Sequence, residues 1–434
     1  MSYIPRQEIE HRIVEDAVAA SPRIQILEAP RGAGKSALLR QVASLLAARG
    51  RLPVLIDMEK ISTSPADFAR HFPSAIMTAM QSVGGMERMG APESLPGAAR
   101  PGTLTHRADE ALRRIDEESS RRRPDPSVLL DEALAFAAAA QVAQGPPLVL
   151  LLDEFAEVAR LGSHAGLREA LTILARRLAE PSPIAIVAAV SPASRPGALL
   201  QMLQRESAGA ISMLKLEPLS VAEMRTFVRS AGCTVREQPD DIEMWMRATG
   251  GRPHYAEILA RRVGSGEDLA TAMSRAMTPP DGGLHQECRF DYHLLVERSR
   301  GHSVVRTILA LLSSREGAQL TGIAKQLRIQ LPTALDYLSW LLEVGLIRRD
   351  GPGYVFADPV LRLWVRLNGP EPIDLLEEVV RFLDTPRVDP LPPARPRGRR
   401  PRAAPPSAPP RQETPQEPSA RSQPRRHDRL MEID

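Results

Sequence analysis

Residues 29–36 read APRGAGKS, and they constrain the fold of this 434-residue chain more than any other segment. They follow a short apolar run, IQILEA at 24–29, and they lead into a helical pattern at 35–49. Apart from an alanine in place of the first glycine, the segment matches the pattern G-x-x-x-x-G-K-[ST] of a phosphate-binding loop. A loop of this kind between a strand and a helix predicts an α/β fold built on parallel strands.

Each residue type in this loop has a physical role. Gly32 and Gly34 let backbone N–H groups turn towards phosphate oxygens without a Cβ in the way. The helix that starts beside the loop adds the positive end of its dipole. Lys35 is predicted to reach the β and γ phosphates of ATP, and the Ser36 hydroxyl to ligate Mg²⁺. The predicted nucleotide-binding residues are Ala29, Pro30, Arg31, Gly32, Ala33, Gly34, Lys35 and Ser36.

A second motif, which is acidic, supports this prediction. The segment PLVLLLDE at 147–154 places Asp153 and Glu154 at the end of a strongly apolar strand. An unpaired carboxylate there costs several kcal/mol, so the pair needs a functional reason. We expect Asp153 to hold Mg²⁺ and Glu154 to be the catalytic base that orients and deprotonates the attacking water. ATP and Mg²⁺ are therefore the expected cofactors, and the chain is expected to be an ATPase.

Apolar strand patterns alternate with helical ones along the first half of the chain. This alternation predicts a parallel five-stranded sheet with helices on both faces. The segment at 84–127, rich in Gly, Pro and charge, interrupts the rhythm and reads mostly as a surface insertion, with a polar helix near 106–119. The predicted strands lie at 24–29, 52–58, 147–154, 184–190 and 210–216.

The rest of the chain divides by composition into three further segments. After a core at 1–217, residues 218–298 show helical patterns only, and residues 299–385 read as three helices, two short strands and a last helix. The final segment at 386–434 has 13 prolines and almost no large apolar side chains. It cannot bury enough surface to offset chain entropy, so we expect a disordered tail.

Ser191 directly follows the predicted strand IAIVAAV. One interpretation is that its hydroxyl senses the γ-phosphate. The alternative is a turn residue before Pro192. The sequence leaves both interpretations open.

Five segments together resemble a known family: APRGAGKS, LVLLLDE, LKLEPLS at 214–220, TGGRPHY at 249–255 and DPVLRLW at 358–364. The combination is similar to the archaeal-type ATPases, which belong with the AAA+ and STAND P-loop proteins related to origin-recognition ATPases. The resemblance covers about residues 1–367. It implies an ASCE-type core at 1–217, a helical lid at 218–298 and a winged-helix domain at 299–385.

The resemblance also implies roles for two arginines. Arg252, in TGGRP, either contacts a phosphate as a sensor-2 arginine or only caps the turn. Arg205, before the last strand, either acts as an arginine finger towards a neighbouring subunit or forms a surface ion pair. The insertion and the arginine-rich tail depart from the family pattern.

The predicted recognition helix of the winged-helix domain has side chains that are unusual for DNA binding. A helix that reads DNA presents Arg, Lys, Asn or Gln to base edges. The helix starting near 332 instead presents Thr333, Asp336, Ser339 and Glu343. Basic side chains close by, sufficient for a modest phosphate contact, are Lys325, Arg328, Arg348 and Arg349. We therefore expect the winged helix to contact a protein, and duplex DNA is the alternative partner. The arginine-rich tail either binds nucleic-acid phosphates or is a solvated linker.

Composition excludes several other classes. The two cysteines, Cys233 and Cys288, are too few for a disulfide framework and match no zinc site. No apolar run is long enough for a membrane span, and the charged N-terminus does not resemble a signal peptide, so a cytoplasmic location is expected.

The function hypotheses follow from these motifs. The first is a slowly hydrolysing AAA+/STAND-like switch, whose nucleotide state controls the lid and winged helix for a protein partner. The alternative is a DNA-handling ATPase, similar to initiators or transposition helpers. Homo-oligomerisation is compatible with both.

Overall fold

The computed structural model describes residues 3–21, 23–83, 104–140, 146–180, 182–207, 211–233, 239–369 and 372–384. The predicted disordered tail lies outside these residues, as does the first part of the predicted insertion. Residues 1–388 form one compact unit. The domain boundaries expected within this unit remain a prediction. No helix among the described residues has the length and hydropathy that crossing a membrane requires.

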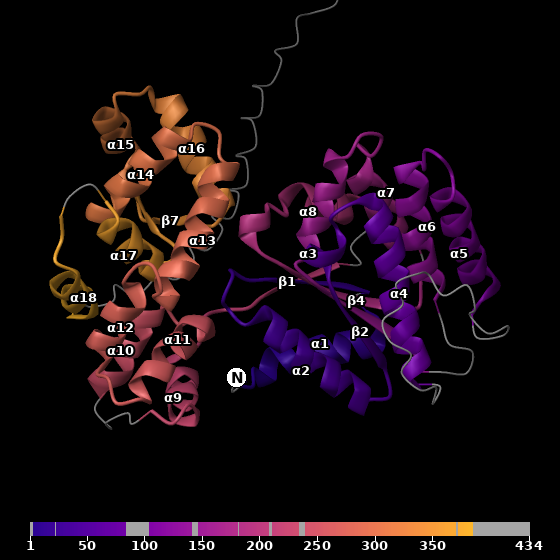
Figure 1. The fold of residues 1–434 in the computed structure, drawn as a ribbon, viewed down its shortest axis with the longest axis horizontal. Helices are drawn as coiled ribbons and strands as arrows, with labels where there is room; N and C mark the ends of the chain where they lie inside the picture. Colours follow the sequence, from indigo (N-terminus) through magenta and orange to yellow (C-terminus); the bar gives the residue numbers. More distant parts are fainter. Residues whose placement is uncertain are drawn as a thin grey trace, which may run out of the picture. The chain divides into compact units, whose positions relative to one another are not determined.

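A five-stranded parallel sheet forms the N-terminal part, as predicted (Figure 1). Its order is β2-β3-β4-β1-β5, so β4 lies between the strand before the phosphate loop and the strand that ends in Asp153. This insertion of a strand between the two motif-bearing strands is the ASCE arrangement that the resemblance implies. The strands are β1 Ile24–Glu28, β2 Leu52–Asp57, β3 Leu148–Asp153, β4 Ala185–Val190 and β5 Ile211–Lys215.

Burial along the strands follows their position in the sheet. All six residues of β4 and five of six in β3 are buried, because central parallel strands are covered on both faces. The edge strand β2 alternates instead, and it carries Pro53, which an edge strand tolerates.

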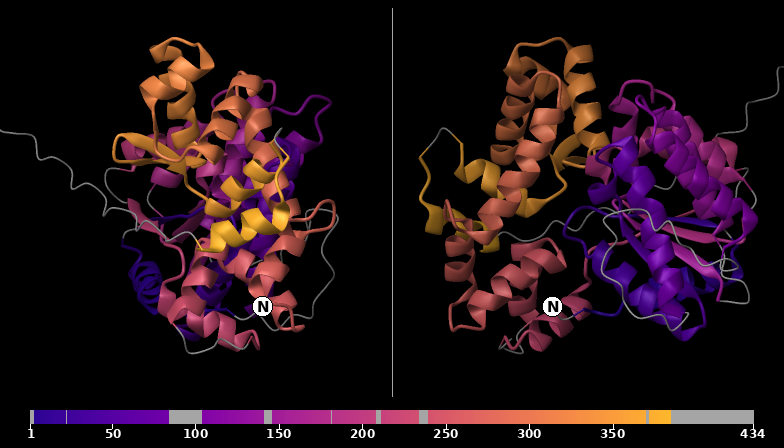
Figure 2. Two further views of the ribbon diagram at one scale, coloured as in Figure 1. Left: turned by 90° about the vertical axis from the view of Figure 1, so that its left-hand side faces the viewer. Right: turned by 45° about the vertical axis from the view of Figure 1, so that its right-hand side comes forward.

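Two layers of helices cover this sheet (Figures 1 and 2). On one face, α1 (Gln7–Ala19) and α2 (Lys35–Ala48) pack on alternate residues of β1, β3 and β4. On the other face lies a larger apolar cluster with helices α4 to α8. The elements of that face are α3 Met58–Ile61, α4 Pro65–Val83, α5 His106–Ser119, α6 Pro126–Ala139, η1 Phe155–Ser163, α7 Ala170–Ala179 and α8 Gly197–Glu206.

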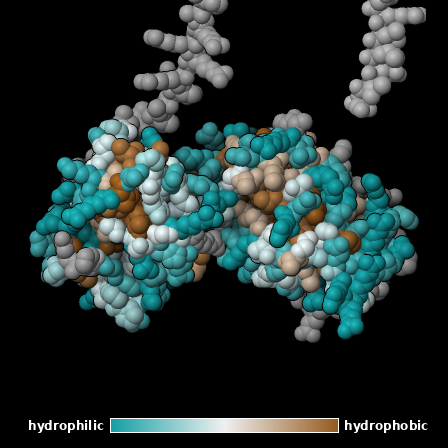
Figure 3. Space-filling view, turned by 90° about the horizontal axis from the view of Figure 1, so that it is seen from above, coloured by the Kyte–Doolittle hydropathy of each residue, from teal (hydrophilic) through white to brown (hydrophobic). Residues whose placement is uncertain are grey.

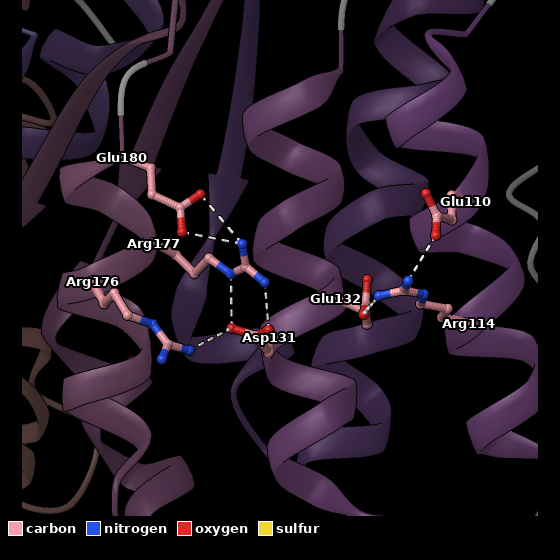
Figure 4. A network of polar contacts seen from close by, with 7 residues as sticks. All are labelled: Glu110, Arg114, Asp131, Glu132, Arg176, Arg177 and Glu180. Atoms are coloured by element: carbon pink, nitrogen blue, oxygen red, sulfur yellow. Dashed lines mark hydrogen bonds and ion pairs between the residues drawn. The ribbon is translucent and has the colours of Figure 1, made fainter.

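The helix expected near 106–119 is present as α5, with a polar exposed face and an apolar face that was not expected. Ala108, Ala111, Leu112 and Ile115 share one face and are buried against the second cluster. Ion pairs join this part of the fold: Arg114 contacts Glu132 of α6 at 2.9 Å, as Figure 4 shows. In the same network, Asp131 of α6 binds Arg176 and Arg177 of α7. One face of α5 is therefore part of the apolar core, whereas the other is exposed.

The helices of the C-terminal part share one apolar core. They begin with α9 Val221–Ser230, α10 Pro239–Thr249, α11 Pro253–Val263, α12 Leu269–Met277 and α13 Gly283–Arg298. A single cluster of buried side chains runs from Leu219 through Ile308 to Leu383, so the predicted lid and winged helix are packed together.

The last elements follow the order expected from the sequence, with one added strand and one added helix. They are α14 His302–Ser314, β6 Ala318–Gln319, α15 Leu320–Leu327, α16 Leu331–Glu343, β7 Ile347–Asp350, β8 Gly353–Phe356, α17 Pro359–Leu367 and α18 Leu375–Asp384. The N-terminal part also contains the short helix η2 Pro192–Ser194, after β4. The strands β7 and β8 form a hairpin, and β6 adds to β8 to give a three-stranded antiparallel sheet.

Candidate nucleotide site

The phosphate loop connects the end of β1 to the start of α2. Gly32 has φ +73° and Gly34 has φ +96°, a backbone region that glycine enters without strain. Gly34 is also the residue from which α2 starts. Ala29, which replaces the usual first glycine, is not among the residues with positive φ, so alanine fits there. The loop therefore has the backbone that the motif predicts.

Lys35 links the loop to the acidic motif. Its side chain is buried, and its Nζ lies 3.1 Å from the carbonyl oxygen of Ala29 and 3.3 Å from that of Pro30. The same Nζ lies 3.3 Å from Oε1 of Glu154. Two motifs more than a hundred residues apart in the sequence thus meet at one ammonium group.

The two carboxylates at the end of β3 have different surroundings. Asp153 accepts a hydrogen bond from the backbone N–H of Glu154 at 3.1 Å. Glu154 has φ +46°, an uncommon conformation for a residue with a side chain, and strain of this kind gathers at functional sites. Burial raises the pKa of the Glu154 carboxyl, although the nearby Lys35 ammonium opposes this. A raised pKa makes a carboxylate a stronger base.

Asp57 is a further acidic residue at this edge of the sheet, and the sequence analysis did not single it out. It ends β2 as Asp153 ends β3, and the two residues are in register across the neighbouring strands. Its carboxylate is 2.9 Å from Nζ of Lys60. The signal was present in the sequence, because LPVLID and LVLLLD end alike.

Ser191 follows β4, which lies between β1 and β3. Its side chain is only 1% exposed, and its Oγ has no hydrogen-bond partner among the described residues. It lines a small cavity together with Pro30, Arg31 and Arg252. A buried hydroxyl without a partner requires an explanation, and a polar ligand at the loop would supply one.

Arg252 also lies beside the phosphate loop, although its partner is an acid from the C-terminal part. It makes no side-chain cap of α11. Its Nη1 lies 2.9 Å from Oδ2 of Asp358 and 3.4 Å from the carbonyl oxygen of Arg31. The next residues also contact the loop: the backbone N–H of His254 donates to the carbonyl of Gly32 at 3.3 Å.

Arg205 stands apart from these residues. It lies in the last turn of α8 and is exposed. Within the described ranges it has no ion pair. Its role as an arginine finger remains a prediction. No group of three or more His, Cys, Asp or Glu side chains among the described residues is arranged to hold a metal ion.

Several solved structures resemble this chain. A Walker-type ATPase of Pyrococcus abyssi is 19% identical to it, with 84% of this chain and 96% of that chain covered and a TM-score of 0.58. The ORC2 protein of Aeropyrum pernix, in ADPNP–ADP complexes, is 14% identical, with 88% and 96% covered and a TM-score of 0.49. AMPPCP-bound DnaA from Aquifex aeolicus is 12% identical, with 79% and 90% covered and a TM-score of 0.33.

The first of these similarities establishes the fold, whereas the other two are too low to carry an argument. No protein-family model matches the sequence, and no curated protein matches it. The parallel sheet, the strand order and the phosphate loop agree with the first similarity. The chain therefore has the fold of the Walker-type P-loop ATPases, as its resemblance to the archaeal-type ATPases predicted.

Proposed function

We propose that this chain binds ATP with Mg²⁺ at the phosphate loop and hydrolyses it slowly. The observation that carries the proposal is the contact of Lys35 with Glu154 at 3.3 Å. It brings the cation expected to bind phosphate and the acid expected to activate water into one site. Phosphoryl transfer depends mainly on such positioning and on electrostatic stabilisation.

The residues of the site have different roles in the proposed reaction. The loop backbone and Lys35 bind the β and γ phosphates, and Glu154 orients the attacking water and accepts its proton. The Ser36 hydroxyl and the Asp153 carboxylate fit Mg²⁺, which prefers oxygen donors and takes few of them from the protein. When bound, Mg²⁺ neutralises charge on the phosphate oxygens.

We further propose that the nucleotide state controls the C-terminal part as a switch towards a protein partner. The contact between His254 and Gly32 ties α11 to the loop. On α16, Leu331 and Leu335 are exposed one helical turn apart, which favours an apolar partner surface. Figure 3 shows apolar patches within the otherwise hydrophilic surface. This supports the AAA+/STAND-like interpretation.

Three substitutions test the nucleotide proposal. Lys35→Ala should weaken ATP binding by about ten-fold or more, since it removes a charge-assisted contact to phosphate. Asp153→Ala should weaken only the Mg²⁺-dependent part of binding. Glu154→Gln should retain binding and lose hydrolysis. Lys215→Ala removes an exposed lysine of β5 and serves as the control. If Lys35→Ala binds ATP as well as the Lys215→Ala control, the proposal is wrong.

A DNA-handling ATPase is the second candidate function. Lys325 of α15, Arg328 just after that helix and Arg349 of β7 are exposed and offer contacts to phosphates. The contact of Glu343 of α16 with Arg195 of the core, at 3.0 and 3.3 Å, argues against this function, because it binds the end of that helix to the core. Hydrolysis rates with and without duplex DNA, at low and moderate salt, decide between the two. Stimulation that fades with salt would favour the DNA-handling function, and a rate indifferent to DNA would favour the switch.

A further inference from the structure

A cluster of four charged side chains lies where the phosphate loop meets the C-terminal helices. Arg31 belongs to the loop, Asp291 to α13, and Arg252 and Asp358 are the residues from which α11 and α17 start. Arg252 and Asp358 form an ion pair at 2.9 Å, with side chains 11% and 6% exposed. Arg31 Nε lies 3.5 Å from Oδ1 of Asp291. We call these four residues the junction cluster.

The junction cluster is balanced in charge, with two cations and two anions. The ionised side chains of Arg252 and Asp358 are buried and are tolerated only when each is paired, so removing one partner leaves an uncompensated charge. Further contacts hold the pairs in place. The Tyr255 hydroxyl donates to Oδ2 of Asp358 at 2.8 Å, and the Arg31 guanidinium lies 5.0 Å from the centre of the Phe290 ring.

The cluster directly adjoins the predicted phosphate site. Arg31 is itself a loop residue, and Nη1 of Arg252 contacts its carbonyl oxygen. Pro253 is so close that a Cβ added at Gly34 would meet its Cγ at 3.7 Å. The phosphates of a bound nucleotide would bring several negative charges beside two guanidinium groups that are already paired. Phosphate oxygens are strong partners for arginine, so they would compete with the two carboxylates.

We propose that nucleotide phosphates compete with Asp291 and Asp358 for Arg31 and Arg252, so that nucleotide binding weakens the docking of α13 and α17 on the phosphate loop. This inference rests on the proposed nucleotide binding and adds the groups through which the C-terminal part responds. The coupling is reciprocal: a chain whose cluster has lost a carboxylate binds nucleotide more tightly.

The test measures the dissociation constant of ATP with Mg²⁺ by calorimetry on the full chain. Asp358→Asn removes one negative charge and keeps the start of α17, because asparagine can still accept the hydrogen bond that the Val360 N–H makes to Oδ1 at 2.9 Å. We expect ATP binding about five-fold tighter than in the parent chain. Asp291→Asn provides a second route to the same result if Asp358→Asn does not fold.

Two control variants distinguish the loss of a negative charge from a general loosening of the packing around the junction cluster. Tyr255→Phe removes the hydrogen bond to Asp358, together with the one that the Tyr255 hydroxyl accepts from Arg252 Nη1 at 3.4 Å, and leaves all charges in place. Glu378→Gln removes a buried carboxylate of α18 that Arg366 holds, far along the chain from the loop residues. Both controls should bind ATP as the parent chain does.

The possible outcomes are distinct. Unchanged or weaker ATP binding in Asp358→Asn and Asp291→Asn, with Lys35→Ala still defective, would overturn the inference and leave the proposed function standing. Equally tight binding in Tyr255→Phe and Asp358→Asn would also overturn it, since loosening rather than charge would then be the cause. A parent chain that binds no ATP would refute the proposed function, and the inference with it.

Discussion

Asp291 should make the stability of this chain depend on pH in an unusual direction, and Asp291→Asn should remove that dependence. The carboxyl lies on α13 and is mostly buried, and burial raises its pKa from an ordinary 3.8 to about 6. Arg31 and Arg252 oppose this rise, whereas Asp358 and Glu287 add to it. Oδ1 of Asp291 has no hydrogen-bond partner among the described residues, and its 3.5 Å contact with Arg31 is an ion pair without hydrogen-bond geometry.

The size and sign of the effect follow from linkage. The difference between 3.8 and about 6 corresponds to about 3 kcal/mol at full ionisation. Between these pH values the folded chain holds a proton that the unfolded chain has lost. The stabilisation from this group is therefore fully present below about pH 4, and it is lost as the pH rises through about 6.

Urea denaturation of the parent and of Asp291→Asn, at intervals from pH 4 to pH 7.5, measures this. The unfolding free energy of Asp291→Asn relative to the parent should rise by about 2–3 kcal/mol across this range. Glu297→Gln changes an exposed carboxylate on the same helix and serves as the matched control. A flat difference for Asp291→Asn would refute the argument, because the carboxyl would then not be held in a desolvated position.

Four further substitutions test other parts of the structure. Leu338→Ala should lower the unfolding free energy by about 2–5 kcal/mol because Leu338 is fully buried, whereas Leu335→Ala, on the exposed face of the same helix, should cost little in a chemical denaturation. Ser191→Ala should leave stability unchanged or raise it, since it deletes a buried hydroxyl without a partner, and should slow hydrolysis if Ser191 senses the γ-phosphate; unchanged hydrolysis would favour the turn interpretation. Arg205→Ala should reduce the hydrolysis rate per chain only at protein concentrations where copies associate, if it is an arginine finger, and a concentration-independent rate would contradict that role.

The fold was predictable where periodicity and local chemistry decide it. The five strands are apolar runs, and the loop has glycines where positive φ is required. The burial of α5 was missed although its signal was available, because Ala108, Ala111, Leu112 and Ile115 repeat at helical spacing within a segment rich in charge. The Gly- and Pro-rich residues around that helix concealed the pattern.

The partners of the site residues were less predictable. Arg252 was expected to contact a phosphate or cap a turn, yet its partner is Asp358, more than a hundred residues later. Nothing local in the sequence pairs them, since their distance depends on how α11, α13 and α17 pack. Asp291 has no motif around it at all, and only its burial beside two arginines makes it notable.

The predicted phosphate loop is thus held from two sides by cationic side chains that each also contact a carboxylate. On the side of the sheet, Lys35 contacts Glu154 and two loop carbonyls. On the side of the helices, Arg252 contacts Asp358 and a third loop carbonyl. Under the proposed function, each of these cations would exchange its present partners, oxygen atoms of the chain itself, for phosphate oxygens. Binding at the loop would then release Glu154 for water and Asp358 from the loop in the same event, so catalysis and the response of the helices would share one cause.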